Sequence, residues 1–338
     1  MTPKTHEPFA ARTLGLTLGA VAAGALGIAI AAPAGAAQPP AEVSGDVLTV
    51  NGTHAPERLA LRLQAGIPGV LEVDFGDDGT AEASFDRATF SRIHVLLRGG
   101  DDQFRMDQTN GTFADEVATI DAGAGDDDLA GGDGAELFFG RSGNDSVDGN
   151  RGDDTGWLGS GTDSFRWDPG DGSDVVEGET GTDTLDFNGA GAPENMSLSA
   201  NGQRSLFLRD VATIRMDMDD VERLDLTALG GPDTMLVGDM TGTDFQRADI
   251  DLSGPAGGGD GQIDRVTVDG TAAADVLRVK TKDARVDVVG LQTEVRVVGS
   301  ETTDLLQVKT FDGDDQVVVD DDVAAIITPS VDLGPGQS

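Results

Sequence analysis

Residues 122–166 divide into five consecutive nonapeptides: AGAGDDDLA, GGDGAELFF, GRSGNDSVD, GNRGDDTGW and LGSGTDSFR. The fourth position of every unit is glycine: Gly125, Gly134, Gly143, Gly152 and Gly161. The sixth position of every unit is acidic: Asp127, Glu136, Asp145, Asp154 and Asp163. The eighth position is apolar in all units except the fourth. A fixed period of this kind indicates a repeat architecture in which one small unit is stacked along the chain.

The residue types at these positions suit a tight turn followed by a short strand. Glycine permits positive φ angles and lets neighbouring backbones approach closely. The x-apolar-x segment forms a strand with one inward side chain, which fills a thin core. The turn directs carbonyl oxygens and one carboxylate to the same point, and Ca²⁺ prefers such hard oxygen ligands. The pattern therefore predicts calcium sites at the turns.

The nonapeptide resembles the hemolysin-type (RTX) calcium-binding repeat of secreted bacterial proteins, G-G-x-G-x-D-x-U-x, over residues 121–187. The resemblance implies a parallel β-roll in which two nonapeptides complete one coil and Ca²⁺ lies between stacked turns. Repeats 18 residues apart then share a side. One edge of the roll would carry Asp127, Asp145 and Asp163, and the other Glu136 and Asp154. The implied metal-binding residues are these five acids and the five fourth-position glycines.

Two departures from the repeat weaken one edge. Glu136 is one methylene longer than the expected aspartate. Gly156 leaves a hole at an inward position, and Trp157 either fills that hole or marks the end of the regular roll. Both defects fall on the Glu136/Asp154 edge, so we expect that edge to bind calcium more weakly.

The sequence on either side of the repeats alternates between apolar and polar residues, as half-buried strands do. Fragments of the repeat recur at 98–106, 170–178, 180–189, 228–237 and 311–319. The pieces at 170–178 and 180–189 continue the roll, and we interpret the scattered others as β-units that have lost most of their calcium turns. The predicted fold class is all-β, a parallel β-roll (an RTX nonapeptide β-solenoid) flanked by further β-strand-rich repeat regions. The predicted regions are 37–46 linker, 47–120 N-terminal β-rich region, 121–187 roll and 188–338 C-terminal β-rich repeat region.

Residues 1–36 have the pattern of a Sec-type signal peptide. Lys4 and Arg12 precede an uncharged stretch, residues 13–32, and Ala34-Gly35-Ala36 provides a small-x-small cleavage pattern. The alternative is a retained anchor helix, since 20 such residues can span a bilayer. We expect cleavage near Ala36 and a secreted chain without a membrane segment, in a space where calcium reaches the millimolar range that extracellular modules use.

Composition excludes several functions. The 338 residues include 61 acidic and 23 basic side chains, a net charge of −38, which repels nucleic acids. There is no cysteine and only three histidines, and H-E-x-x-H, G-x-S-x-G and G-K-[ST] motifs are missing. An EF-hand-like run that begins at Asp249 has Pro255 inside the loop and no helical flanks, so we reject it. We therefore expect no catalytic residues.

The sequence thus predicts a secreted, non-enzymatic calcium-binding protein whose RTX β-roll folds on binding Ca²⁺, with calcium ions as partners and no identified protein or glycan ligand. Two alternatives remain open. One is an envelope or matrix adhesion protein that calcium stiffens. The other is a polysaccharide-active enzyme on a β-solenoid, which a cleft with two calcium-free carboxylates would favour.

Overall fold

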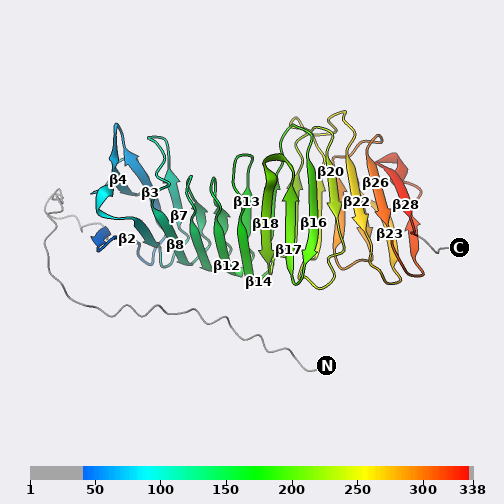
Figure 1. Cartoon of the computed structure of the whole chain (residues 1–338), viewed down its shortest axis with the longest axis horizontal. Helices are drawn as coiled ribbons and strands as arrows, with labels where there is room; N and C mark the ends of the chain where they lie inside the picture. The colour runs from blue at the N-terminus through cyan, green and yellow to red at the C-terminus, as the bar shows by residue number, and fades with distance from the viewer. Residues whose placement is uncertain (1–40, 335–338) are drawn as a thin grey trace, which may run out of the picture.

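The computed structural model describes residues 41–334, which form an elongated stack of strands running from the N-terminal to the C-terminal end (Figure 1). These residues build two sheets of 14 strands each. Most neighbouring strands are parallel, so the predicted all-β, parallel solenoid is confirmed. The predicted signal peptide, residues 1–36, lies outside the described residues. None of the helices in the described range is long and apolar enough to cross a membrane.

The first sheet contains, in spatial order, β1 (Ala41–Ser44), β2 (Val47–Asn51), β6 (Arg92–Leu96), β8 (Val117–Ala124), β10 (Leu137–Ser142), β12 (Thr155–Gly161), β14 (Val175–Gly181), β18 (Ile214–Asp219), β17 (Arg204–Arg209), β16 (Asn195–Asn201), β20 (Thr234–Val237), β22 (Arg265–Asp269), β26 (Leu305–Lys309) and β28 (Thr328–Asp332). The second sheet contains β27 (Gln316–Val319), β23 (Val276–Lys282), β24 (Arg285–Val289), β25 (Glu294–Val298), β21 (Arg247–Asp251), β19 (Arg223–Thr227), β15 (Thr184–Asn188), β13 (Ser164–Trp167), β11 (Ser146–Asp148), β9 (Asp128–Ala130), β7 (Gln103–Asp107), β3 (Arg58–Gln64), β4 (Ile67–Phe75) and β5 (Ala83–Asp86). Three short 3-10 turns complete the described structure: η1 (Arg87–Thr89), η2 (Val211–Thr213) and η3 (Val323–Ala325).

The nonapeptides form the regular part of this stack. From β8 to β15 the chain changes sheet after every strand, so two nonapeptides complete one coil. Val147 on β11 pairs in parallel with Leu129 on β9 and with Phe165 on β13, each 18 residues away. Identical spacing places equivalent turns directly above one another, which creates the two edges that the repeat predicts.

Inward side chains at the eighth position fill the space between the sheets. Leu129, Phe138, Val147 and Phe165 are fully buried. The hole expected at Gly156 is occupied by Phe165, because an added Cβ there would lie 3.1 Å from the Phe165 ring. A larger side chain at residue 156 would therefore collide with that ring.

The expectation that Trp157 fills this hole or ends the regular roll is wrong. Trp157 lies on the outer face of β12 and stacks on Phe139 of β10, with 4.7 Å between ring centroids. The coil continues past Trp157 into β13, β14 and β15. Residue parity decides this outcome, since adjacent residues of a strand point to opposite faces.

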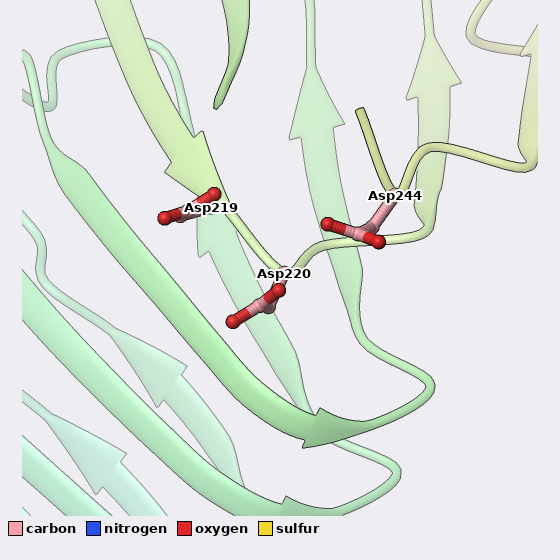
Figure 2. A group of neighbouring side chains, drawn as sticks. All are labelled: Asp219, Asp220 and Asp244. Atoms are coloured by element: carbon pink, nitrogen blue, oxygen red, sulfur yellow. The ribbon is translucent and has the colours of Figure 1, made fainter. Parts of the chain in front are cut away.

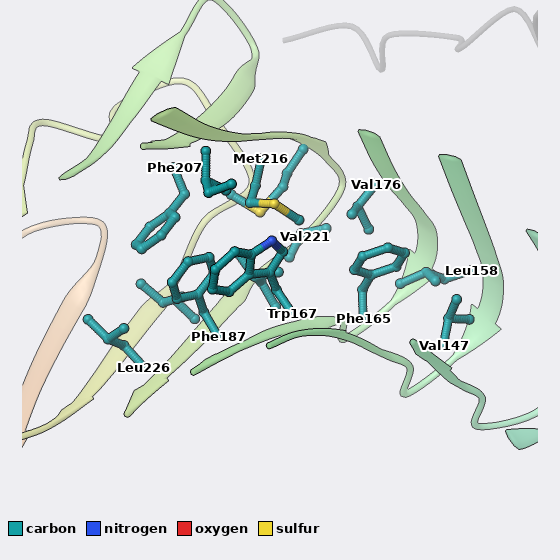
Figure 3. Close-up of a cluster of buried hydrophobic side chains, with 14 of the residues drawn as sticks. Val147, Leu158, Phe165, Trp167, Val176, Phe187, Phe207, Met216, Val221 and Leu226 are labelled. Carbon is teal, nitrogen blue, oxygen red and sulfur yellow. The ribbon is translucent and has the colours of Figure 1, made fainter. Parts of the chain in front are cut away.

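The core becomes more aromatic where the nonapeptides end. Trp167 and Phe187 stack with centroids 4.2 Å apart, and Phe207 contacts the other side of Phe187 (Figure 3). Phe207 lies on β17, part of an antiparallel insertion formed by β16, β17 and β18. Similar insertions occur at β3–β5 and β23–β25.

Both sheets continue across the ends of the nonapeptide region. β8 pairs with β6, and β15 pairs with β19. Residues 41–44, within the predicted linker, form β1 and pair with β2. The predicted division at residues 121 and 187 therefore stays a prediction about where calcium-binding turns begin and end.

Candidate metal sites at the turns

The sixth-position acids of the repeats lie at the turns, and their side chains are buried. Each of the aspartate carboxylates accepts a hydrogen bond from a backbone N–H of the preceding coil. The Asp127 N–H donates to Asp145 Oδ1 (2.8 Å), and the Asp145 N–H donates to Asp163 Oδ1 (2.7 Å). On the other edge the Glu136 N–H donates to Asp154 Oδ1 (2.7 Å). The structure thus brings Asp127, Asp145 and Asp163 together on one edge and Glu136 and Asp154 on the other.

The aspartates differ from Glu136 in their second carboxylate oxygen. Within the described residues, Oδ2 of Asp127, Asp145, Asp154 and Asp163 is buried and has no hydrogen-bond partner. A buried polar atom without a partner costs free energy, and for a charged atom the cost is high unless a cation or a proton compensates it. The aspartate turns therefore fit a bound cation.

The same burial raises the pKa values of these aspartates. Burial raises the pKa of Asp127 to about 6, of Asp145 to about 7 and of Asp154 to about 9. Repulsion from Asp127 and Asp163 adds to the effect of burial on the pKa of Asp145. Without a metal ion, the charged form of these groups is therefore disfavoured.

Glu136 differs from the aspartates because its longer arm folds back. Its Oε2 accepts a hydrogen bond from the Gly132 N–H (2.8 Å), four residues earlier. Glu57, Glu194 and Asp275 accept the N–H of the residue four positions earlier in the same way. Burial still raises the pKa of Glu136 to about 7. The turn of Glu136 satisfies its own carboxylate, which supports the expectation of weaker calcium binding there.

The fourth-position glycines hold the turns at contact distance. A Cβ added to Gly143 would lie 1.7 Å from the carbonyl oxygen of Gly125, and one added to Gly161 would lie 1.6 Å from that of Gly143. Gly134 lacks the positive φ of the other four, and its Cβ would meet Glu136 Oε1 instead. The turns therefore stack so that their carbonyl oxygens form a row beside the aspartates. This row provides backbone oxygens of the kind that a calcium site needs.

We expect Gly152→Ala to destabilise the protein far more than Gly170→Ala. Both glycines have nearly the same φ, +124° and +126°, so both substitutions carry the same backbone strain. The added Cβ would lie 1.6 Å from the Gly134 carbonyl oxygen at residue 152 and would meet open space at residue 170. Overpacking against backbone should add about 3 kcal/mol to the loss at residue 152. Urea midpoints compare the variants, and equal losses would contradict this account of the turns.

The series of stacked acids extends beyond the nonapeptides. The Asp102 N–H donates to Asp127 Oδ1 (2.8 Å), and the Asp163 N–H donates to Asp183 Oδ1 (3.0 Å). On the other edge Asp154 is followed by Asp174 (2.8 Å). Among described residues, Asp102, Asp183 and Asp233 also have a buried Oδ2 without a partner. The scattered fragments at 98–106 and 228–237, which we interpreted as β-units without calcium turns, thus hold aspartates in the same position.

A shorter motif could have found these residues. Asp102, Asp183 and Asp233 each follow a glycine by two positions and precede a buried apolar residue by two positions. This G-x-D-x-U core lies outside the nine-residue period because the flanking coils have other lengths. The five-residue motif G-x-D-x-U, rather than the nine-residue period, therefore identifies these aspartates.

The EF-hand-like run is not a loop from its first position, because Asp249 to Asp251 belong to β21 and only the residues after Asp251 form a loop. Asp249 and Asp251 lie on β21, in a shallow groove of about 180 Å³ on the second sheet. Asp225, Arg285 and Arg296 also line this groove. Burial first, and the neighbouring Asp249 next, raise the pKa of Asp225. The groove therefore holds two adjacent carboxylates outside the stacked turns.

Comparison with known proteins gives little information. No family model matches the chain, and no curated protein matches it. Among solved structures, the chain is similar to the extracellular lipase LipA from Serratia marcescens, at 15% identity and a TM-score of 0.20. The match covers 64% of this chain and 43% of the lipase, so this chain spans less than half of the lipase's length.

This comparison corrects one expectation. The solved structure is an enzyme, which contradicts our expectation of a non-enzymatic protein, and we withdraw that expectation. At a TM-score of 0.20 the similarity carries no argument about what this chain itself does. Its function has to be argued from its own residues.

Proposed function

We propose that this chain is a secreted calcium-binding protein whose β-roll, residues 121–187, folds when Ca²⁺ binds at its turns. One observation carries the proposal: within the roll, five buried aspartates each keep one carboxylate oxygen without a partner, beside a row of backbone carbonyl oxygens. Ca²⁺ takes six to eight oxygen ligands of these two kinds. The chemistry of the donors and the lack of nitrogen or sulfur ligands at the turns favour calcium over transition metals.

Each aspartate has two tasks in this proposal. Its Oδ1 holds the backbone of the preceding coil, and its Oδ2 is available to a cation between coils. Asp145 lies between Asp127 and Asp163, whose charges both raise its pKa, so it takes part in two such contacts. Bound calcium would supply the positive charge that offsets this repulsion, and its binding free energy would become folding free energy.

A second candidate function is action on a polysaccharide, and one observation favours it. The groove on the second sheet holds the neighbouring carboxylates Asp225 and Asp249 close to Arg285 and Arg296. Paired carboxylates are what glycoside-cleaving sites use. A calcium-stiffened adhesion protein remains the third alternative. Neither alternative conflicts with calcium at the turns.

We expect Asp145→Asn to lower the number of calcium ions bound per chain by two, because Asp145 adjoins an aspartate on each side. Asparagine keeps an acceptor for the Asp127 N–H but removes the anionic oxygen. Asp251→Asn is the matched control, since Asp251 Oδ1 accepts only a local hydrogen bond from the Ser253 N–H (2.8 Å). Isothermal titration calorimetry gives the number of sites. Equal site counts in the two variants would remove the support for calcium at the turns.

A further inference from the structure

Two aromatic rings lie on the outer face of the first sheet, and both are half-buried. Phe139 on β10 and Trp157 on β12 are partners in parallel strands, and their rings stack with an interplanar angle of 5°. Asp121 on β8 is the strand partner of Phe139, and Glu177 on β14 is the strand partner of Trp157. The row therefore has a carboxylate at each end and two stacked rings between them.

At one end of this row the chain itself supplies a cation. The Arg141 guanidinium lies over the ring of Phe139, 4.8 Å from its centroid, so Arg141 and Trp157 cover the two faces of that ring. Arg141 Nη2 also pairs with Asp121 Oδ2 (2.7 Å). A cation over an aromatic face is attracted by the negative potential of the ring. This end of the row thus combines a ring, a cation and a carboxylate.

At the other end of the row the cation is missing. Among the described residues, no guanidinium or ammonium group lies over the ring of Trp157. Gly159 follows Trp157 by two positions, as Arg141 follows Phe139. A Cβ added to Gly159 would lie 2.2 Å from the carbonyl oxygen of Arg141, so the fold does not admit a side chain there. The face of Trp157 toward Glu177 therefore receives no cation from this strand.

The carboxylate of Glu177 shares its counter-ion with other acids. Glu177 pairs with Arg204 (2.9 Å), but Arg204 also pairs with Asp217 (2.5 Å) and Asp219 (3.4 Å). Arg215 adds one further cation, beside Asp217 (2.6 Å). Burial first, with the charges of Asp219 and Asp217 adding to it, raises the pKa of Glu177 in spite of Arg204. Two guanidinium groups thus serve three carboxylates.

The surplus of negative charge extends beyond this group. Asp219 lies beside Asp220 and Asp244, and one oxygen of each is within 4.8 Å of the others (Figure 2). Glu179, two residues after Glu177 on β14, is exposed. The surface next to the stacked rings therefore attracts positive charge and repels negative charge.

We propose that the outer face of the first sheet at Trp157 binds a basic segment of a partner protein, whose arginine or lysine side chain covers the face of Trp157 beside Glu177. The bound cation repeats what Arg141 does at Phe139, and tryptophan gives the strongest cation–π attraction. Charge complementarity favours this partner, because the chain has a net charge of −38. The surface is separate from the turn aspartates, so the proposal does not depend on calcium there.

The test is isothermal titration calorimetry of a short oligoarginine peptide into the full chain in millimolar Ca²⁺. Trp157→Leu should weaken binding by roughly 3- to 30-fold, because the cation–π contact is lost without a change of charge. Glu177→Gln should also weaken it. Phe311→Leu and Asp321→Asn are the matched controls, since they remove an exposed ring and an exposed charge elsewhere and should leave the affinity nearly unchanged.

A further variant, Trp157→Phe, keeps a ring stacked on Phe139, so it should fold like the wild type and lose less affinity than Trp157→Leu. Unchanged affinity in Trp157→Leu, or equal losses in Glu177→Gln and Asp321→Asn, would indicate general attraction to an acidic chain and overturn the proposal. Failure of the wild type to bind the peptide overturns it too. Binding of a neutral glucan oligosaccharide in place of the peptide, lost in Trp157→Leu, would assign the ring to a sugar and reject the basic partner.

Discussion

Removing calcium should unfold the roll. Seven aspartates in the described residues, from Asp102 to Asp233, have a buried Oδ2 without a partner. Each such atom costs about 1–3 kcal/mol, so that together they offset the whole ~5–15 kcal/mol by which a domain is usually stable. The chain has no disulfide to resist unfolding, and its net charge of −38 adds repulsion.

Far-UV circular dichroism in excess chelator and then in millimolar Ca²⁺ measures this effect. We expect the β signal to be reduced and its melting temperature to be lowered in chelator, and both to be restored by calcium. Magnesium is the control, and it should restore the signal poorly because it requires shorter bonds and octahedral geometry. Identical spectra and melting temperatures in chelator and in calcium would show that the turns do not need a cation.

The calcium-free chain should be more stable in mild acid than in mild alkali. Burial raises the pKa of Asp127, Asp145 and Asp154 in the folded state to between about 6 and about 9, from an ordinary value near 3.8. Between the two values the folded state binds more protons than the unfolded state, so the free energy of unfolding falls as pH rises. A proton on Oδ2 takes the place of the missing cation.

Thermal melts in chelator at pH 5.5 and pH 8 provide the measurement. The melting temperature should be higher at pH 5.5 by about 5 °C or more, since several groups each contribute on the order of 1 kcal/mol. With saturating calcium the trend should disappear or reverse, because protons then compete with the metal for the same oxygens. A higher melting temperature at pH 8 in chelator is the result that would falsify the assigned cause.

The sequence alone determined the regular part of the fold and which residues line its edges. Glycine at the fourth position and an acid at the sixth impose the same turn each time, so a strict period of nine places Asp127, Asp145 and Asp163 in line. These are local effects of chain geometry and residue type, and the parallel pairing of Leu129, Val147 and Phe165 follows from them. The same reasoning placed the apolar eighth positions inside.

Only the tertiary structure decided which hydrogen-bond partner each acidic side chain has. The bond from the Gly132 N–H to Glu136, the outward stacking of Trp157 and the unpartnered oxygens of the aspartates depend on neighbours that the period does not specify. Outside the nonapeptides the coils differ in length: successive stacked acids are 20 residues apart at Asp163–Asp183 and 39 apart at Asp183–Glu222. Sequence distance then no longer predicts which turns meet. For that reason only the folded chain shows that Asp219, Asp220 and Asp244 come together at the end of the roll.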